Sequence, residues 1–94
     1  MNEDLALAAL AALAQKTRME VYRALVGAGE GGMAAGELAG ALGVRQNSLS
    51  GHFAILSRAG LISSERRGTT IVYRVATGGT HDLRAFLQRL DGLA

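Results

Sequence analysis

The sequence has no cysteine among its 94 residues. This absence excludes disulfides, thiol redox chemistry and every metal site built from thiolates. A long hydrophobic run is missing as well, since the apolar stretch 5–14 is about half as long as a membrane span. The chain begins with an acidic segment, Met1-Asn2-Glu3-Asp4, where a secretory signal would be basic. Together these features predict a soluble protein of the cytoplasm.

Groups that catalyse reactions are also scarce. With two histidines, no cysteine and no nucleophile elbow, no catalytic constellation can be assembled. The stretch 27–32 matches GxGxxG, but it follows a predicted helix instead of a strand and lacks the downstream acidic residue of a dinucleotide site. We therefore interpret it as a flexible loop, and we predict that the chain is not an enzyme and has no cofactor.

Positive charge is concentrated in one part of the chain. The net charge is only +2, but residues 43–75 carry five arginines against Glu65 alone, a net of +4. Such a distribution favours a polyanionic partner, and double-stranded DNA is the obvious one. An ordinary solvated surface rich in arginine explains the charge equally well, so charge alone does not decide between the two.

Hydrophobic patterning predicts two helices in the first third of the chain. Residues 5–14 are apolar on all sides and rich in helix formers, so we expect a second subunit to cover part of this helix. Thr17 and Glu20 have the spacing of a capping box, which predicts a second helix that ends at the glycines from Gly27 onward. Its inward-facing residues are expected to be Met19, Tyr22, Leu25 and Val26.

Residues 36–53 have the pattern of two short helices joined at a glycine, with small and aliphatic residues where the helices must touch. This pattern is typical of a helix-turn-helix, which presents the start of its second helix to the DNA major groove. A helical wheel of residues 46–58 divides them into two faces. Leu49, Phe53 and Leu56 face inward, and Asn47, Gly51, Ala54 and Arg58 are expected to face DNA.

Two antiparallel strands are predicted at 61–67 and 70–75, with Arg67-Gly68-Thr69 as their turn. Gly78-Gly79 ends the second strand, and Thr80 is expected to cap a final helix. The predicted fold is mainly α with a small β wing, a winged helix-turn-helix in a single domain 1–94 with the order ααααββα. The apolar surface predicts a homodimer through the first and last helices. Its expected interface residues are Leu5, Leu10, Leu83, Phe86, Leu87 and Leu90.

From about Leu13 through the final helix, the chain resembles the ArsR/SmtB family. The resemblance rests on the element order, a wing that closes on Tyr73, and four segments: Lys16-Thr17-Arg18, Gly36-Glu37-Leu38-Ala39, Ser48-Leu49-Ser50-Gly51-His52-Phe53 and Ala59-Gly60-Leu61-Ile62. It implies a dimeric bacterial repressor that releases an inverted-repeat operator when an inducer binds.

The resemblance also implies which residues contact DNA: Gln46, Asn47, Ser48, Ser50 and His52. Gln46, Asn47 and Ser48 are the first candidates for base contacts, because an amide both donates to and accepts from an adenine edge. His52 lies nearer the core, so it either contacts a phosphate or has no role.

Two residues depart from the family pattern. Arg45 stands where Ser or Asp often caps the recognition helix, so the cap is missing and the arginine is available for a phosphate. Gly51 is expected at the most outward position of that helix, at a cost of about 0.5–1 kcal/mol relative to Ala. Either the bare backbone lets DNA approach closely, or the long side chain usual in the family was lost; we favour the second.

The predicted wing supplies a further set of candidate DNA contacts. Arg66 and Arg67 precede its turn and Thr69 lies within it. One guanidinium is expected in the minor groove, where the negative potential of narrow A·T tracts is greatest. The alternative is a solvated hairpin with no DNA contact.

No metal site is predicted. Thiolate-type relatives place a cysteine pair where this chain has Met33-Ala34-Ala35, and other relatives carry cysteines past the last helix, where Leu90-Asp91-Gly92 stands. His81 and Asp82 match only half of a zinc site of the family, because the chain ends at Ala94 without a second ligand pair. We interpret these two residues as a feature of the helix start.

The inducer is therefore expected to be a small molecule, if one exists. The competing hypothesis is a winged-helix module that binds another protein through its apolar first and last helices and binds no operator. Salt-dependent binding to duplex DNA separates the two.

Overall fold

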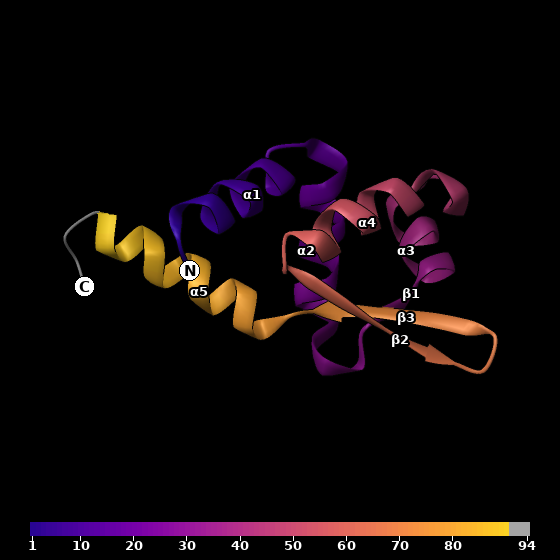
Figure 1. The fold of residues 1–94 in the computed structure, drawn as a ribbon. Coiled ribbons are helices and arrows are strands. Elements are labelled where there is room, and N and C mark those ends of the chain that lie inside the picture. Colours follow the sequence, from indigo (N-terminus) through magenta and orange to yellow (C-terminus); the bar gives the residue numbers. More distant parts are fainter. Residues whose placement is uncertain (91–94) are drawn as a thin grey trace.

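A computed structural model describes residues 1–90 of the chain, which form an elongated body of 44 × 23 × 20 Å. Its order confirms the predicted helices and wing (Figure 1). Two 3₁₀ turns and one short strand are additional. The elements are α1 Glu3–Leu13, α2 Lys16–Ala28, η1 Gly29–Gly31, β1 Met33–Ala34, α3 Ala35–Leu42, η2 Gln46–Ser48, α4 Ser50–Arg58, β2 Ile62–Arg67, β3 Thr70–Val75 and α5 Thr77–Leu90.

The strand that the sequence did not predict completes a three-stranded antiparallel sheet in the order β1-β3-β2. Two residues are too few to show a period, so nothing in the sequence separated β1 from the preceding glycines. The approach of β1 to β3 requires Gly32, which has a φ of +67°, because a Cβ there would lie 2.2 Å from the carbonyl oxygen of Tyr73.

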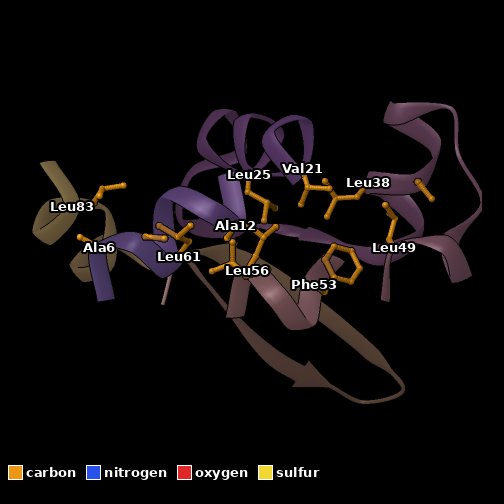
Figure 2. Packing of buried hydrophobic residues seen from close by; sticks show 13 residues of the cluster. Ala6, Ala12, Val21, Leu25, Leu38, Leu49, Phe53, Leu56, Leu61 and Leu83 are labelled. Carbon is orange, nitrogen blue, oxygen red and sulfur yellow. The ribbon is translucent and has the colours of Figure 1, made fainter. Parts of the chain in front are cut away.

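One continuous hydrophobic core runs along the body (Figure 2). Leu83 and Ala6 lie at one end of it, Leu25 and Leu56 in the middle, and Leu49 at the helix-turn-helix end. The large side chains that are completely buried come from α2, α3, α4 and the segments next to them. This core holds the helix-turn-helix against the root of the wing, so their relative position is set by packing.

Two predicted helix starts are wrong, both by a few residues. α2 is capped by Gln15, whose side-chain oxygen accepts the Arg18 amide at 2.8 Å, so Thr17 lies inside the first turn and forms no capping box. α5 begins at Thr77, so Thr80 caps nothing and the glycine pair lies within the helix. Glycine is needed inside α5 for a tertiary reason, since a Cβ at Gly79 would lie 1.9 Å from the carbonyl oxygen of Gly60.

The first helix buries three of its alanines and exposes most of its leucines. Ala6, Ala9 and Ala12 are buried, whereas Leu5 and Leu7 are more than half exposed. In α2 the expectation for Val26 is wrong, because this side chain is 57% exposed. Small side chains let α1 lie close to its neighbours, which leaves its large apolar side chains outside. Within residues 1–90, no helix is long and apolar enough to cross a membrane.

Candidate nucleic-acid interface

The helix-turn-helix turns at Gly43. This residue ends α3 in the left-handed conformation, with φ +68° and ψ +33°, and the Val44 amide donates back to the Ala39 carbonyl at 3.0 Å. The chain then leaves α3 at a sharp angle. The resulting turn confirms the two short helices predicted between residues 36 and 53.

The helical wheel assumed one continuous helix from residue 46, but the second helix is interrupted. Gln46–Ser48 form a 3₁₀ turn, and α4 begins at Ser50. Arg45 provides no side-chain cap, as predicted; the Ser48 hydroxyl instead donates to the Arg45 carbonyl at 2.7 Å. The predicted contact residues of this segment all have exposed side chains: Arg45, Gln46, Asn47, Ser48 and Ser50.

Gln46 is held close to the first helix of the pair. A Cβ added at Gly36 would meet the Gln46 side-chain oxygen at 3.2 Å, so the amide group lies over the start of α3. Glu37 on the same turn accepts the Ala34 amide at 2.9 Å and satisfies a free donor of that helix end. The contact between Gln46 and the start of α3 was not predicted from the sequence.

The inward face of α4 is as predicted. Leu49, Phe53 and Leu56 are buried, and the Phe53 ring stacks on Tyr73 of β3 with centroids 4.0 Å apart. On the outward side Gly51 is exposed, with nothing within 4 Å of an added Cβ. Ala54, however, is half-buried, and the neighbouring Ile55 is 39% exposed, so the expectation that Ala54 faces fully outward is wrong.

His52 is half-buried and lies against α2. Arg18 donates from one guanidinium nitrogen to Nδ1 of His52 at 3.4 Å, and its Nε donates to the Ala12 carbonyl at 2.7 Å. Arg18 thus joins the end of α1, the start of α2 and the recognition helix. This contact gives His52 a structural partner that neither sequence interpretation included.

The wing separates its two arginines onto opposite faces. Register pairs Arg66 with Ile71 and Glu65 with Val72, and side chains alternate along a strand. Arg66 therefore shares a face with Tyr73, the face that packs on α4, whereas Arg67 lies on the other.

Glu65 occupies that other face between two arginines. It accepts from Arg67 and from Arg74, each at 3.1 Å, and these hydrogen bonds lower the pKa of the Glu65 carboxyl. Within residues 1–90 Arg66 has no ion pair. Half of the predicted wing charge is thus already neutralised, and Arg66 has the free guanidinium.

A groove of about 910 Å³ lies between the helix-turn-helix and the wing. Gln46, Asn47 and Ser50 line it from one side, and Thr69 and Ile71 from the other. Figure 1 shows both walls at the end of the molecule away from α1 and α5. The fold therefore brings together the start of the recognition helix and the wing turn, which are separated by more than a dozen residues in sequence.

The predicted interface leucines lie at the opposite end of the molecule. Leu5, Leu10 and Leu87 are exposed, and Leu90 is 66% exposed. Phe86 is half-buried and Leu83 belongs to the protomer's own core, so Leu83 has little surface left for a partner. Leu7 of α1 is also 57% exposed, and it was not among the predicted interface residues, since the sequence did not show which side of α1 is buried.

His81 and Asp82 are not at a helix start. Because α5 begins at Thr77, both residues lie in its second turn and both are exposed. Their interpretation as a capping and dipole feature is therefore wrong. In the described part of the chain, no three His, Cys, Asp or Glu residues are grouped closely enough to hold a metal ion. The segment Asp91–Gly92 considered for ligands lies outside the described residues.

Solved structures of bacterial regulators resemble this fold over nearly its whole length. HlyU from Vibrio cholerae is 27% identical with a TM-score of 0.74, and the match covers 96% of this chain and 97% of HlyU. An ArsR-like transcriptional regulator from Rhodococcus is also 27% identical, with a TM-score of 0.82 and coverages of 95% and 81%. A homodimeric winged helix-turn-helix DNA-binding domain from Mycobacterium bovis, a possible ArsR-family regulator, is 27% identical with a TM-score of 0.74. The match covers 95% of this chain and 80% of that domain.

Sequence comparison agrees with these structures. A family model described as a helix-turn-helix domain matches residues 13–65, more than half of the chain, whereas none of the curated proteins matches. Fold, groove and relatives define a DNA-binding transcription regulator, a class distinct from enzymes. The chain belongs to this helix-turn-helix domain family and is a winged-helix regulator of the ArsR/SmtB type.

Proposed function

We propose that the protein is a homodimeric repressor that binds an inverted-repeat operator. The observation that carries the proposal is the position of two surfaces at opposite ends of one body: a groove lined by Gln46, Asn47 and Thr69, and a set of exposed leucines on α1 and α5. Pairing two copies through the leucines leaves both grooves free. Because the dimer has twofold symmetry, its two recognition segments match an inverted repeat.

Within each groove we assign base contacts to Gln46 and Asn47, whose amides donate and accept. Ser48 and Ser50 use their hydroxyl protons on the Arg45 and Asn47 carbonyls, so their oxygens are left mainly as acceptors. Such hydroxyls discriminate poorly between bases, and we assign them to the rim of the contact.

Phosphate and minor-groove contacts fall to the basic residues. We assign Arg45 and Arg66 to them, with Thr69 at the wing turn, because Arg66 lies on the face of the sheet that packs on α4. Arg67 has a smaller proposed share because Glu65 already pairs with it. His52 supports the recognition helix through Arg18 instead of contacting phosphate directly.

The experiment that tests this function selects duplexes from a random pool with the purified protein and sequences those retained. We expect an inverted repeat whose half-sites are about one helical turn apart. A reporter placed downstream of that repeat should be expressed less when the protein is present. Retention of duplexes with no common sequence would overturn operator binding, and increased expression would overturn repression.

A second function is favoured by one observation, the exposed leucines of α1 and α5, which would equally suit a different protein partner. In that case the groove would have no duplex-binding role. Titration of a random duplex at several salt concentrations separates the two functions, because phosphate contacts make affinity fall steeply with salt.

A further inference from the structure

A second cleft, of about 680 Å³, lies on another side of the molecule, between α2, β3 and α5. Its apolar walls are Leu25 and Val26 of α2 and Val75 of β3, with the Tyr22 ring beside them. A hydrogen bond between the Tyr22 and Thr80 hydroxyls joins α2 to α5 at this cleft. The volume falls in the range of small-molecule sites. The cleft shares no lining residue with the groove between the wing and the recognition helix, although β3 contributes residues to both.

The charged groups of this cleft are predominantly basic, and His81 and the hydroxyls of Tyr22, Thr77 and Thr80 are its other polar groups. Arg74 and Arg84 both line it, and Glu30 is its one carboxylate. Arg74 donates to Glu65 through a single nitrogen, while its buried Nε has no hydrogen-bond partner within residues 1–90. Neither Arg84 nor Glu30 has an ion pair in the same described part. Guanidinium groups with unused donors beside an apolar wall suit a carboxylate attached to an apolar body.

We propose that this cleft binds a small carboxylate with an aliphatic or aromatic body, with the carboxylate on Arg84 and Arg74 and the body against Val26 and Val75. The residues of α5 that line the cleft lie roughly a third of a turn from the stripe containing Leu87 and Leu90. Arg84 lies one turn before Leu87, so the ligand site borders the proposed dimer surface on α5.

A second part of the proposal rests on the proposed function: an inducer acts by binding in this cleft. Arg74 donates to Glu65, and Glu65 accepts from Arg67 near the wing turn, so a ligand carboxylate that binds Arg74 is linked through Glu65 to the wing. The same ligand contacts α5, whose end carries the proposed dimer surface. The ligand binds the DNA-free protein better than the DNA-bound protein. Ligand binding therefore weakens operator binding, and operator binding weakens ligand binding by the same factor.

Calorimetric titration with octanoate and octylamine tests the binding site without DNA. We expect saturable binding of octanoate and none of octylamine, because the two probes share a body and differ in charge. Arg84→Gln should weaken octanoate binding about tenfold, since it removes one charged hydrogen bond. Arg23→Gln is the matched control on an exposed arginine outside the cleft and should leave binding unchanged. Equal binding of the two probes, no octanoate binding, or equal affinity in Arg84→Gln would overturn the site.

The coupling is tested separately by adding octanoate to a preformed complex with the selected operator. Release that is lost in Arg84→Gln and kept in Arg23→Gln supports the inducer role. Octanoate binding with the expected variant pattern but without release overturns the coupling and leaves the site established. A protein that binds octanoate but selects no operator contradicts the proposed function alone, so the two failures are distinguishable.

Discussion

The two ends of this molecule share one hydrophobic core but differ in which side chains they bury and which they expose. At the helix-turn-helix end, large side chains such as Leu49 and Phe53 are buried, and the exposed residues at the start of the recognition helix, 45–48 and Ser50, are polar or basic. At the α1–α5 end the arrangement is reversed, with Ala6 and Ala9 buried and leucines outside. A chain selected only to be a stable monomer would bury its leucines. The difference indicates that both ends are surfaces for partners, one charged and one apolar.

The contrast also extends to how firmly each end is built. The groove residues lie on η2, α4, β3 and the wing turn. The Phe53–Tyr73 stack holds α4 against β3, and the Ser48 hydroxyl donates to the Arg45 carbonyl at η2. The exposed leucines of α5 lie beyond Leu83, where the protomer core ends. We therefore expect substitutions at the two ends to affect different measurements, and the predictions below run from the largest effect to the smallest.

The largest effect is expected from Leu87→Glu with Leu90→Glu. Charges on an apolar dimer surface oppose association, so light scattering should show a mass near 9.8 kDa instead of twice that value. Affinity for the inverted repeat should fall on the order of 10²–10⁴-fold, because the second half-site no longer binds in the same complex. Val26→Glu, on an equally exposed valine, is the control; a dimer that survives the leucine changes would contradict the proposed interface.

Asn47→Ala is expected to have the next largest effect. The Asn47 amide can donate to and accept from one base. Its loss should cost about 1–3 kcal/mol of binding free energy at one operator position and leave the affinity for random duplex nearly unchanged. Competition binding with single-base operator variants measures this relaxation. Equal loss on operator and random duplex would show that Asn47 contacts the backbone.

Arg66→Ala and Arg67→Ala compare the two faces of the wing. Arg66→Ala should weaken binding on every sequence and lower the slope of log affinity against log salt by about 1, since one phosphate contact is removed. Arg67→Ala should change the slope less, because this arginine remains paired with Glu65. Salt titrations of both variants on one duplex give the result, and equal slopes would contradict the assignment of faces.

Gly51→Ala examines the open position on the recognition helix. A methyl group there meets nothing within 4 Å, so the free energy of unfolding should rise by about 0.5–1 kcal/mol. Chemical denaturation measures this gain. Operator affinity then decides between the two interpretations of Gly51: unchanged affinity favours a lost side chain, whereas weaker binding favours a close approach of DNA to the backbone.

The smallest effect concerns Glu65. Hydrogen bonds from Arg67 and Arg74 lower the pKa of this exposed carboxyl, so its contribution to wing stability is present above the ordinary glutamate pKa and is lost as pH falls through the lowered value. An NMR titration of the side-chain carboxyl should show this low pKa, and Arg67→Ala should raise it. An unchanged titration in that variant would mean that the ion pair is absent in solution.

Most of the elements were predictable because their signals are local. The inward residues Leu49, Phe53 and Leu56 follow one helical face, and Gly68 between two β-rich runs predicts the wing turn, where its φ is +65°. The missed features depend on contacts between distant residues. Gly79 in the first turn of α5 lies against Gly60, and Gly32 lets β1 approach Tyr73. No window of sequence contains both members of such a pair.

Sequence alone specified the order of the helices and of the two wing strands and excluded thiolate chemistry, because periodicity, composition and turn chemistry act within a few residues. The residues expected to contact DNA stay a prediction. The tertiary structure decided which way these side chains face. It placed Arg66 beside the groove and Arg67 against Glu65, turned the leucines of α1 outward, and paired His52 with Arg18. Alternation along a strand or helix states which residues share a face, but only packing against the rest of the chain selects the face that is buried.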